Sequence, residues 1–222
     1  MQKLRKNLSY KGQIIYYNLI LKDQKYIRIK TNEDEIVVSA PFYVKDWEIE
    51  HLIYKNIAKI LKILEFKEIH KKFEIAEEGF IKIFDEKIPV SFKSDAAINL
   101  KYVFKLYDET EITIKHMYKK LVQIFLNIFE KRMQHWKEIM NLNFKNLSIK
   151  EIKGKWGVCF PEKSKIVLNI RLIHYPQICL DYVIVHELSH LIHKNHSKDF
   201  WYLVQKYLPD YKKYSDMLKV KV

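Results

Sequence analysis

Four histidines and one glutamate lie in a part of the chain that is otherwise strongly apolar. Residues 186–196 read HELSHLIHKNH, and they follow the apolar triplet VIV at 183–185. A helix with this composition is expected to be buried, and a buried imidazole needs a hydrogen-bond, charge or metal partner. The alternative is an amphipathic helix whose histidines are solvated, which its apolar residues disfavour. The stretch therefore restricts the fold to one that gives each imidazole a partner.

The first five of these residues form the pattern His-Glu-x-x-His. In an α-helix, His186 and His190 lie one turn apart and about 40° apart around the axis, so both rings can reach one ion. The ion would lie about 2.0 to 2.1 Å from each ring nitrogen if it is zinc. Glu187 is rotated away from that edge, where it can take a proton from a water that zinc activates. The spacing predicts a Zn²⁺ site with Glu187 as general base.

The third metal ligand follows by elimination. No glutamate follows Glu187, which excludes the zinc sites that take a glutamate from a later helix. The remaining candidates are His174, His193, His196 and an aspartate. His193 shares a face with His186 but lies about 10.5 Å further along a straight helix, too far to bind the same ion. Asp199 is expected in the first turn of the next helix, where a carboxylate favours the helix dipole. His196 can fold back, because the first helix is expected to end before it. The predicted ligands are His186, His190 and His196, with water in the fourth position.

The first hundred residues are typical of short strands with one helix between them. Runs of β-branched and aromatic residues between polar turns predict strands at 14–20, 26–30, 35–39, 80–84, 90–92 and 100–106. Apolar residues at helical spacing predict one helix over 47–64, with Asp46 as its N-cap.

The pattern changes near residue 108. The later residues predict a long helix over 112–140, strands at 156–160 and 165–170, and helices over 177–193 and 198–208, the last capped by Ser197. We therefore expect an α+β protein with two parts: residues 1–108, rich in strands, and residues 109–222, which carry the histidine cluster.

Four segments carry a resemblance to a known family: Lys155-Trp156-Gly157-Val158-Cys159, 166–172, 181–190 and 195–201. With these segments the chain resembles the YgjP-like metallopeptidases, zinc-dependent hydrolases related to SprT-type and WLM proteins. The resemblance spans most of the chain and is most specific over 154–201. It implies a zincin-like catalytic half, in which a long helix backs a small sheet and the helix of the His-Glu-x-x-His motif. It also implies His186, His190 and His196 as metal ligands and Glu187 as general base, in agreement with the residues predicted above.

The chain departs from the family just before the motif. Lys155, Val158, Phe160 and Ser164 stand where the family usually has arginine, serine, serine and glycine. In zinc peptidases of this architecture, the strand that precedes the active-site helix often lines the cleft and pairs with an extended substrate. The resemblance thus implies that the strand at 165–170 contacts substrate. The candidate substrate-binding residues on it are Val167 and Asn169, for which sheet packing is the alternative role.

Composition bears on location and partners. Two cysteines, Cys159 and Cys179, are too few for a disulfide framework, and no stretch reaches the roughly 18 to 20 apolar residues of a membrane helix. We therefore expect a cytoplasmic protein with no membrane partner. The 40 Lys+Arg against 27 Asp+Glu give a net charge of +13, which favours a polyanion partner. Only four of the forty are arginines, which argues against specific base readout.

The predicted function is hydrolysis of peptide bonds in a polypeptide substrate by zinc-activated water. One alternative is a DNA-associated protein, either a SprT-like protease or a nucleic-acid-binding protein with a structural metal, and non-specific nucleic-acid contact is expected in that case. Another is a non-peptide metal hydrolase that uses the same residues. The oligomeric state and the physiological substrate stay open.

Overall fold

The structure is a computed structural model, and it describes residues 2–32, 35–69, 71–95 and 101–219. The chain divides into one unit of residues 1–71 and another of residues 72–221. Both contain helices and strands, so the predicted α+β class is confirmed. The change of sequence pattern near residue 108 falls inside the second unit, because the strands before it and the long helix after it share one hydrophobic core.

The first unit is a four-stranded sheet with one helix on one face. The sheet has the order β1 (Gln2–Tyr10), β2 (Gln13–Leu21), β4 (Glu35–Ala40), β3 (Arg28–Asn32), and the helix is α1 (Asp46–Ile69). Only β2 and β4 are parallel. Apolar side chains from alternate positions of the strands pack against the isoleucines of α1. The predicted strands and helix are present, whereas β1 was not predicted, since six of its nine residues are polar or charged.

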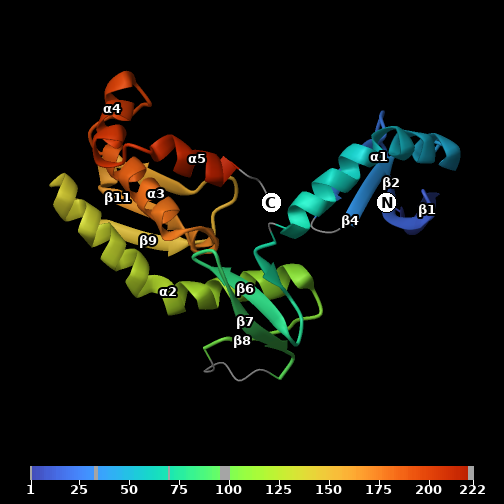
Figure 1. Cartoon of the computed structure of the whole chain (residues 1–222), viewed down its shortest axis with the longest axis horizontal. Coiled ribbons are helices and arrows are strands. Elements are labelled where there is room, and N and C mark those ends of the chain that lie inside the picture. Colours follow the sequence, from blue (N-terminus) through green and yellow to red (C-terminus); the bar gives the residue numbers. More distant parts are fainter. Residues whose placement is uncertain (1, 33–34, 70, 96–100, 220–222) are drawn as a thin grey trace. The chain divides into compact units, whose positions relative to one another are not determined.

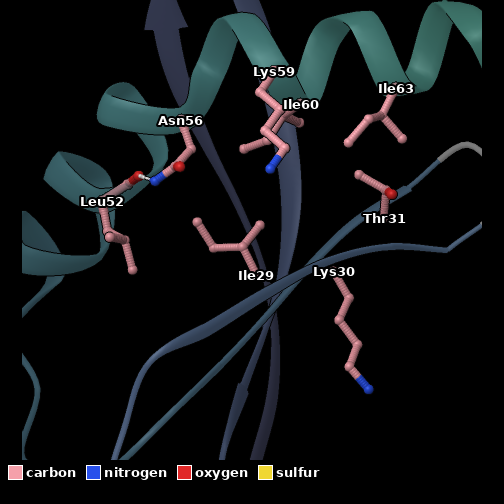
Figure 2. Close-up of a pocket in the computed structure, with 8 residues that line it drawn as sticks. All are labelled: Ile29, Lys30, Thr31, Leu52, Asn56, Lys59, Ile60 and Ile63. Carbon is pink, nitrogen blue, oxygen red and sulfur yellow. Dashed lines mark hydrogen bonds between the residues drawn. The ribbon is translucent and has the colours of Figure 1, made fainter.

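Figure 2 shows that successive side chains of β3 point to opposite faces of the sheet. On β3, Ile29 and Thr31 lie on the α1 side, and the side chain of Lys30 points away from the helix. The space between β3 and α1 is a hollow of about 360 Å³. It is lined by Ile29, Lys30, Thr31, Leu52, Asn56, Lys59, Ile60 and Ile63. The opposite face of the sheet carries exposed residues, among them Ile14 and Tyr16 at 62% and 53% exposure.

The second unit contains two further sheets. One has the order β5 (Phe73–Glu74), β6 (Gly79–Ile83), β7 (Glu86–Lys93), β8 (Val103–Lys105), and the other the order β10 (Gly157–Phe160), β11 (Lys165–Asn169), β9 (Asn146–Lys150). The helices are α2 (Thr110–Met140), α3 (Gln177–Ser189), α4 (Lys198–Tyr207) and α5 (Tyr211–Lys219). A 3₁₀ turn at Pro161–Lys163 joins β10 to β11 as an antiparallel hairpin.

The long helix α2 packs against α3 and against the β10-β11-β9 sheet, as Figure 1 shows. Its buried residues recur at helical spacing from Met117 to Met140 and join the core that contains α3. The predicted long backing helix is confirmed. Four features of the second unit differ from the predictions: β5, β9 and α5 were not predicted, and α3 ends at Ser189, four residues before the expected end. Among the described residues, no helix has the length and apolar character of a membrane span.

One buried ion pair connects α2 to α3. Nε and Nη2 of Arg132 each donate to a different carboxylate oxygen of Asp181, both at 2.7 Å. The side chain of Asp181 is 6% exposed, so this bidentate pair is largely removed from water. It fixes α3 on α2 about one turn before the His-Glu-x-x-His motif.

His174, one of the nine histidines, is a buried core residue. Its Nδ1 donates to the backbone carbonyl of Lys82 at 2.8 Å, and its Nε2 accepts from the hydroxyl of Tyr118 at 2.9 Å. Burial lowers the pKa of His174 to about 4, although the Lys82 carbonyl opposes that shift. Both ring nitrogens have partners in the core, so His174 is not a metal ligand.

We predict that His174 makes stability fall in mild acid. Its ordinary pKa near 6.5 exceeds its folded pKa of about 4, so the unfolded chain binds the extra proton between these values. The neutral ring therefore stabilises the fold fully above about pH 6.5, and this contribution is lost as pH falls to about 4, up to roughly 3 kcal/mol. Denaturant unfolding of wild type and His174→Gln at several pH values measures it.

The difference in unfolding free energy between wild type and His174→Gln should decrease as pH falls from about 6.5 to about 4. The matched control is His135→Gln, on the exposed side of α2, which should leave the pH dependence unchanged. A gap that stays constant from pH 7 to pH 4 would contradict the assignment.

Candidate metal centre

The three predicted metal ligands lie together in the structure. His186 is in the last turn of α3, His190 caps the helix, and His196 lies in the loop before α4. One ring nitrogen from each lies within 4.8 Å of the others. The Nε2 atoms of His186 and His196 are 3.1 Å apart, whereas two nitrogens on one tetrahedral zinc ion lie roughly 3.3 to 3.4 Å apart. The cluster therefore fits a metal ion with little rearrangement.

The protonation of the rings also suits a metal ion. Burial, together with the neighbouring His190 and His196, lowers the pKa of His186 to about 3. Burial also lowers the pKa of His190, against the effect of the His193 carbonyl. Metal ions bind the neutral form of imidazole, so these rings need no deprotonation at neutral pH.

The backbone carbonyl of His193 orients His190. It lies 3.0 Å from Nδ1 of His190, which must then carry the proton and leave Nε2 as the ligand atom. His193 was judged a poor ligand on a straight helix. The helix ends early instead, and the His193 ring still lies outside the cluster. Nδ1 of His186 is buried and has no hydrogen-bond partner among the described residues.

Aromatic side chains from α4 hold the loop ligand in place. The His196 ring is stacked on Trp201 at 5.5 Å and 22°, and Trp201 is stacked on Tyr211 of α5 at 5.2 Å. Phe200 packs against His186 and His190 at ring distances of 4.9 and 4.5 Å. Trp201 and Phe200 are therefore part of the wall of the cluster.

Ser197 caps α4, as predicted, with its hydroxyl oxygen accepting from the backbone N–H of Phe200 at 3.3 Å. Asp199 lies in the first turn of that helix and outside the histidine cluster. The start of α4 is thus fixed directly after the His196 loop.

Glu187 is buried between α3 and β10. It is 5% exposed, and burial raises its pKa to about 7, partly offset by a hydrogen bond from the backbone N–H of Cys159 and by the charge of Lys155. A Cβ atom at Gly157 would lie 2.6 Å from one carboxylate oxygen of Glu187. Only glycine leaves room for the carboxylate, which makes Gly157 part of the site. A glycine inside a strand pattern is a sequence signal for such a close approach.

The edge of β10 next to Glu187 can be identified from the sheet register. The N–H of Asn169 donates to the carbonyl of Trp156, so these two residues form a hydrogen-bonded antiparallel pair. By alternation, the N–H and C=O groups of Gly157 and Cys159 point away from β11. The N–H of Cys159 that reaches Glu187 is thus on the outer edge of the sheet.

Val167 and Asn169 lie on β11, the central strand of the sheet, and are 4% and 2% exposed. The Asn169 amide donates to the carbonyls of Ile152 and Lys155 at 2.8 and 2.7 Å, and its oxygen accepts from the N–H of Arg171 at 3.1 Å. Both edges of β11 are paired, so this strand has no free edge for a substrate. These contacts support sheet packing as the role of Val167 and Asn169.

Comparison with known proteins identifies the family of this chain. A family model described as the YgjP-like metallopeptidase domain matches residues 25–221. No curated protein matches the chain. The metallopeptidase zymogen of Pyrococcus abyssi abylysin is similar to part of the chain, with 24% identity, a TM-score of 0.39, and coverage of 42% of this chain and 94% of that one. The zymogen of Methanocaldococcus jannaschii jannalysin has 23% identity, a TM-score of 0.37, and coverage of 42% and 97%.

The family match covers the N-terminal sheet from β3 onward, the long helix α2, the His-Glu-x-x-His helix and the loop that carries His196. The resemblance found in the sequence is therefore confirmed. The chain belongs to the YgjP-like metallopeptidase family.

Proposed function

We propose that this protein is a zinc-dependent peptidase with a zincin-like catalytic half, in which Glu187 is the general base. The observation that carries the proposal is the convergence of three imidazole nitrogens within 4.8 Å, together with the burial of the Glu187 carboxylate against β10. Three neutral nitrogen ligands without a thiolate or carboxylate are typical of catalytic zinc sites, which keep a fourth position open. Zinc bound here would supply a Lewis acid that polarises the substrate carbonyl and makes water more acidic.

The residues of the chain have separate roles in this proposal. His186, His190 and His196 bind the ion. Glu187 is held away from the ligand set by its contacts with β10, so its carboxylate is free to accept a proton from the attacking water and to pass it to the leaving amine. The buried surroundings exclude bulk water from that proton transfer.

We further propose that an extended polypeptide pairs with β10. Among the described residues β10 is an edge strand, and its outer edge is the one that faces Glu187. Strand addition binds the main chain of a substrate and places little demand on its side chains. A peptide on this edge would pass beside the general base, which the central strand β11 does not permit.

We predict that the three-histidine set is required for metal binding and that the His193 ring is not. Purified wild type should contain about one zinc per chain, and His196→Ala should weaken zinc binding by at least about a hundredfold. His193→Ala should keep the zinc, because the backbone carbonyl of residue 193 is what orients His190. Elemental analysis with a competing chelator measures both, and equal loss from the two variants would refute the ligand assignment.

A second prediction concerns the general base. Glu187→Gln keeps a hydrogen-bonding side chain of the same size, so the protein should retain zinc while cleavage of an unfolded polypeptide falls about 10² to 10⁴-fold. Asp199→Asn makes the same chemical change on the first turn of α4 and should cleave like wild type. Undiminished cleavage by Glu187→Gln would remove Glu187 from the mechanism.

The contact between Gly157 and Glu187 leads to a third prediction. In Gly157→Ala, the added methyl group would displace the carboxylate, whose oxygen lies 2.6 Å from the Cβ position. We expect zinc content like wild type and activity lower by at least about tenfold, because the proton acceptor is misplaced. Ser148→Ala, on β9 of the same sheet, is the matched control. Full activity of Gly157→Ala would mean that the carboxylate does not work from its position against β10.

A further inference from the structure

The open face of the N-terminal sheet carries a regular arrangement of cations. The face toward α1 is identified by contacts: Lys6 pairs with Asp46, and Tyr10 lies against Tyr54 of the helix. The odd-numbered residues of β1 therefore face the other way. On β3, Lys30 points away from α1, as Figure 2 shows.

The sheet register places these cations in two rows that run straight across the open face. One row is Arg5, Asn18, Val37 and Lys30, and the next is Lys3, Ile20, Ser39 and Arg28. Each row thus has a cation on β1 and a cation on β3, with uncharged residues on the two central strands. Three strand spacings separate the two columns of cations, which is about 14 Å.

The arginines distinguish this face from a general lysine surface. Of the four arginines, Arg132 and Arg171 pair with Asp181 and Glu151 in the second unit. The other two, Arg5 and Arg28, both lie on the open sheet face. In the part of the chain that the structure describes, neither is paired with a carboxylate, and Arg5 instead lies over the Tyr16 ring at 5.2 Å. Guanidinium groups bind phosphate in a bidentate manner, so the placement of these two is informative.

An apolar strip on β2 lies beside the first row of cations. It consists of Tyr16 and Ile14, which are exposed at 53% and 62% and lie opposite Asn7 and Ser9 of β1. A hollow of about 330 Å³ opens beside Tyr16 and is lined in part by Arg5, Asn18 and Glu35, and the Glu35 carboxylate accepts from the Asn18 amide at 2.7 Å. Exposed aromatic rings on a four-stranded sheet can stack unpaired bases, and cations at its edges can bind the backbone phosphates.

We propose that the open face of the β1-β2-β4-β3 sheet binds single-stranded nucleic acid. Bases lie on Tyr16 and the apolar strip, and phosphates bind Lys3, Arg5, Arg28 and Lys30. A duplex does not fit this surface, because its bases are stacked on one another and cannot stack on Tyr16. The site is separate from the histidine cluster and does not depend on the proposed function.

The test uses the full-length protein and a fluorescent oligothymidylate of about 15 nucleotides, the upper range of single-strand site sizes. Anisotropy gives the affinity between about 50 and 200 mM salt. Arg5→Gln/Arg28→Gln should weaken binding by roughly tenfold or more at the lower salt and reduce the salt slope by about 1.4, since about 0.7 is lost per phosphate contact. The control Lys55→Gln/Lys62→Gln removes the same charge from exposed positions on α1 and should change little.

Tyr16→Leu tests base stacking. It should weaken binding to the oligothymidylate at least about fivefold without changing the salt slope, and it should not affect the weaker binding of a duplex. Tyr202→Leu, at a site 74% exposed on α4, is the matched control. His196→Ala should bind the oligonucleotide like wild type, which separates this result from the fate of the metal centre.

Three outcomes would overturn the proposal. Equal effects of the two charge pairs would mean that net charge alone attracts the polyanion. No effect of Tyr16→Leu would remove base stacking. Equal competition by polyglutamate, charge for charge, would assign the face to acidic polypeptides. If the arginine variant unfolds, Lys3→Gln/Lys30→Gln tests the same two columns of cations.

Discussion

Helix α3 is buried on almost every side, and it has polar side chains in the core of the second unit. The packing of the neighbouring elements depends on giving these side chains partners. Each of them needs a partner from another element. Arg132 on α2 pairs with Asp181, and the backbone of β10 donates to Glu187. The end of α3 and the loop after it supply the His193 carbonyl and the His196 ring that complete the histidine cluster. Burial lowers the pKa of His186 and of His190, which keeps these two rings neutral, and β10 holds the buried carboxylate of Glu187. The burial that packs α3 in the core therefore also suits its two imidazoles to metal binding.

The local sequence pattern predicted the helices and most strands because apolar spacing reports which face of an element is buried. It missed β9, whose partner β11 is parallel and lies about 19 residues away, since no local signal records such a pairing. It also placed the end of α3 too late. The apolar residues Leu191 and Ile192 continue the helical pattern, but the chain turns there so that the His193 carbonyl reaches His190. A local hydrogen bond between the His190 ring and the backbone accompanies that boundary, and apolar spacing does not report it.

The ligand set could be predicted because it depends on helix geometry and on a short elimination. The supporting residues could not, because each contributes through a contact with a distant segment. Gly157 leaves the space that the Glu187 carboxylate occupies, and Trp201 stacks on the His196 ring. The Asn169 amide donates to the backbone of the loop that precedes β10. We propose β10 in place of β11 as the substrate strand, because both edges of β11 are paired within the sheet. The scarcity of arginine argued against specific base readout, but the count does not show where the arginines lie. Two of the four pair with carboxylates in the second unit, and the other two share one face of the N-terminal sheet.

The central claim is that three imidazoles of this chain hold one zinc ion in a site with an open position. Zinc K-edge X-ray absorption of the purified protein tests it most directly. The account predicts three imidazole nitrogens and one further nitrogen or oxygen at about 2.0 to 2.1 Å, with no sulfur at about 2.3 Å. The imidazole signal should fall to two rings in His196→Ala. A sulfur ligand from Cys159 or Cys179, or an unchanged imidazole signal in that variant, would contradict the assignment of the metal centre.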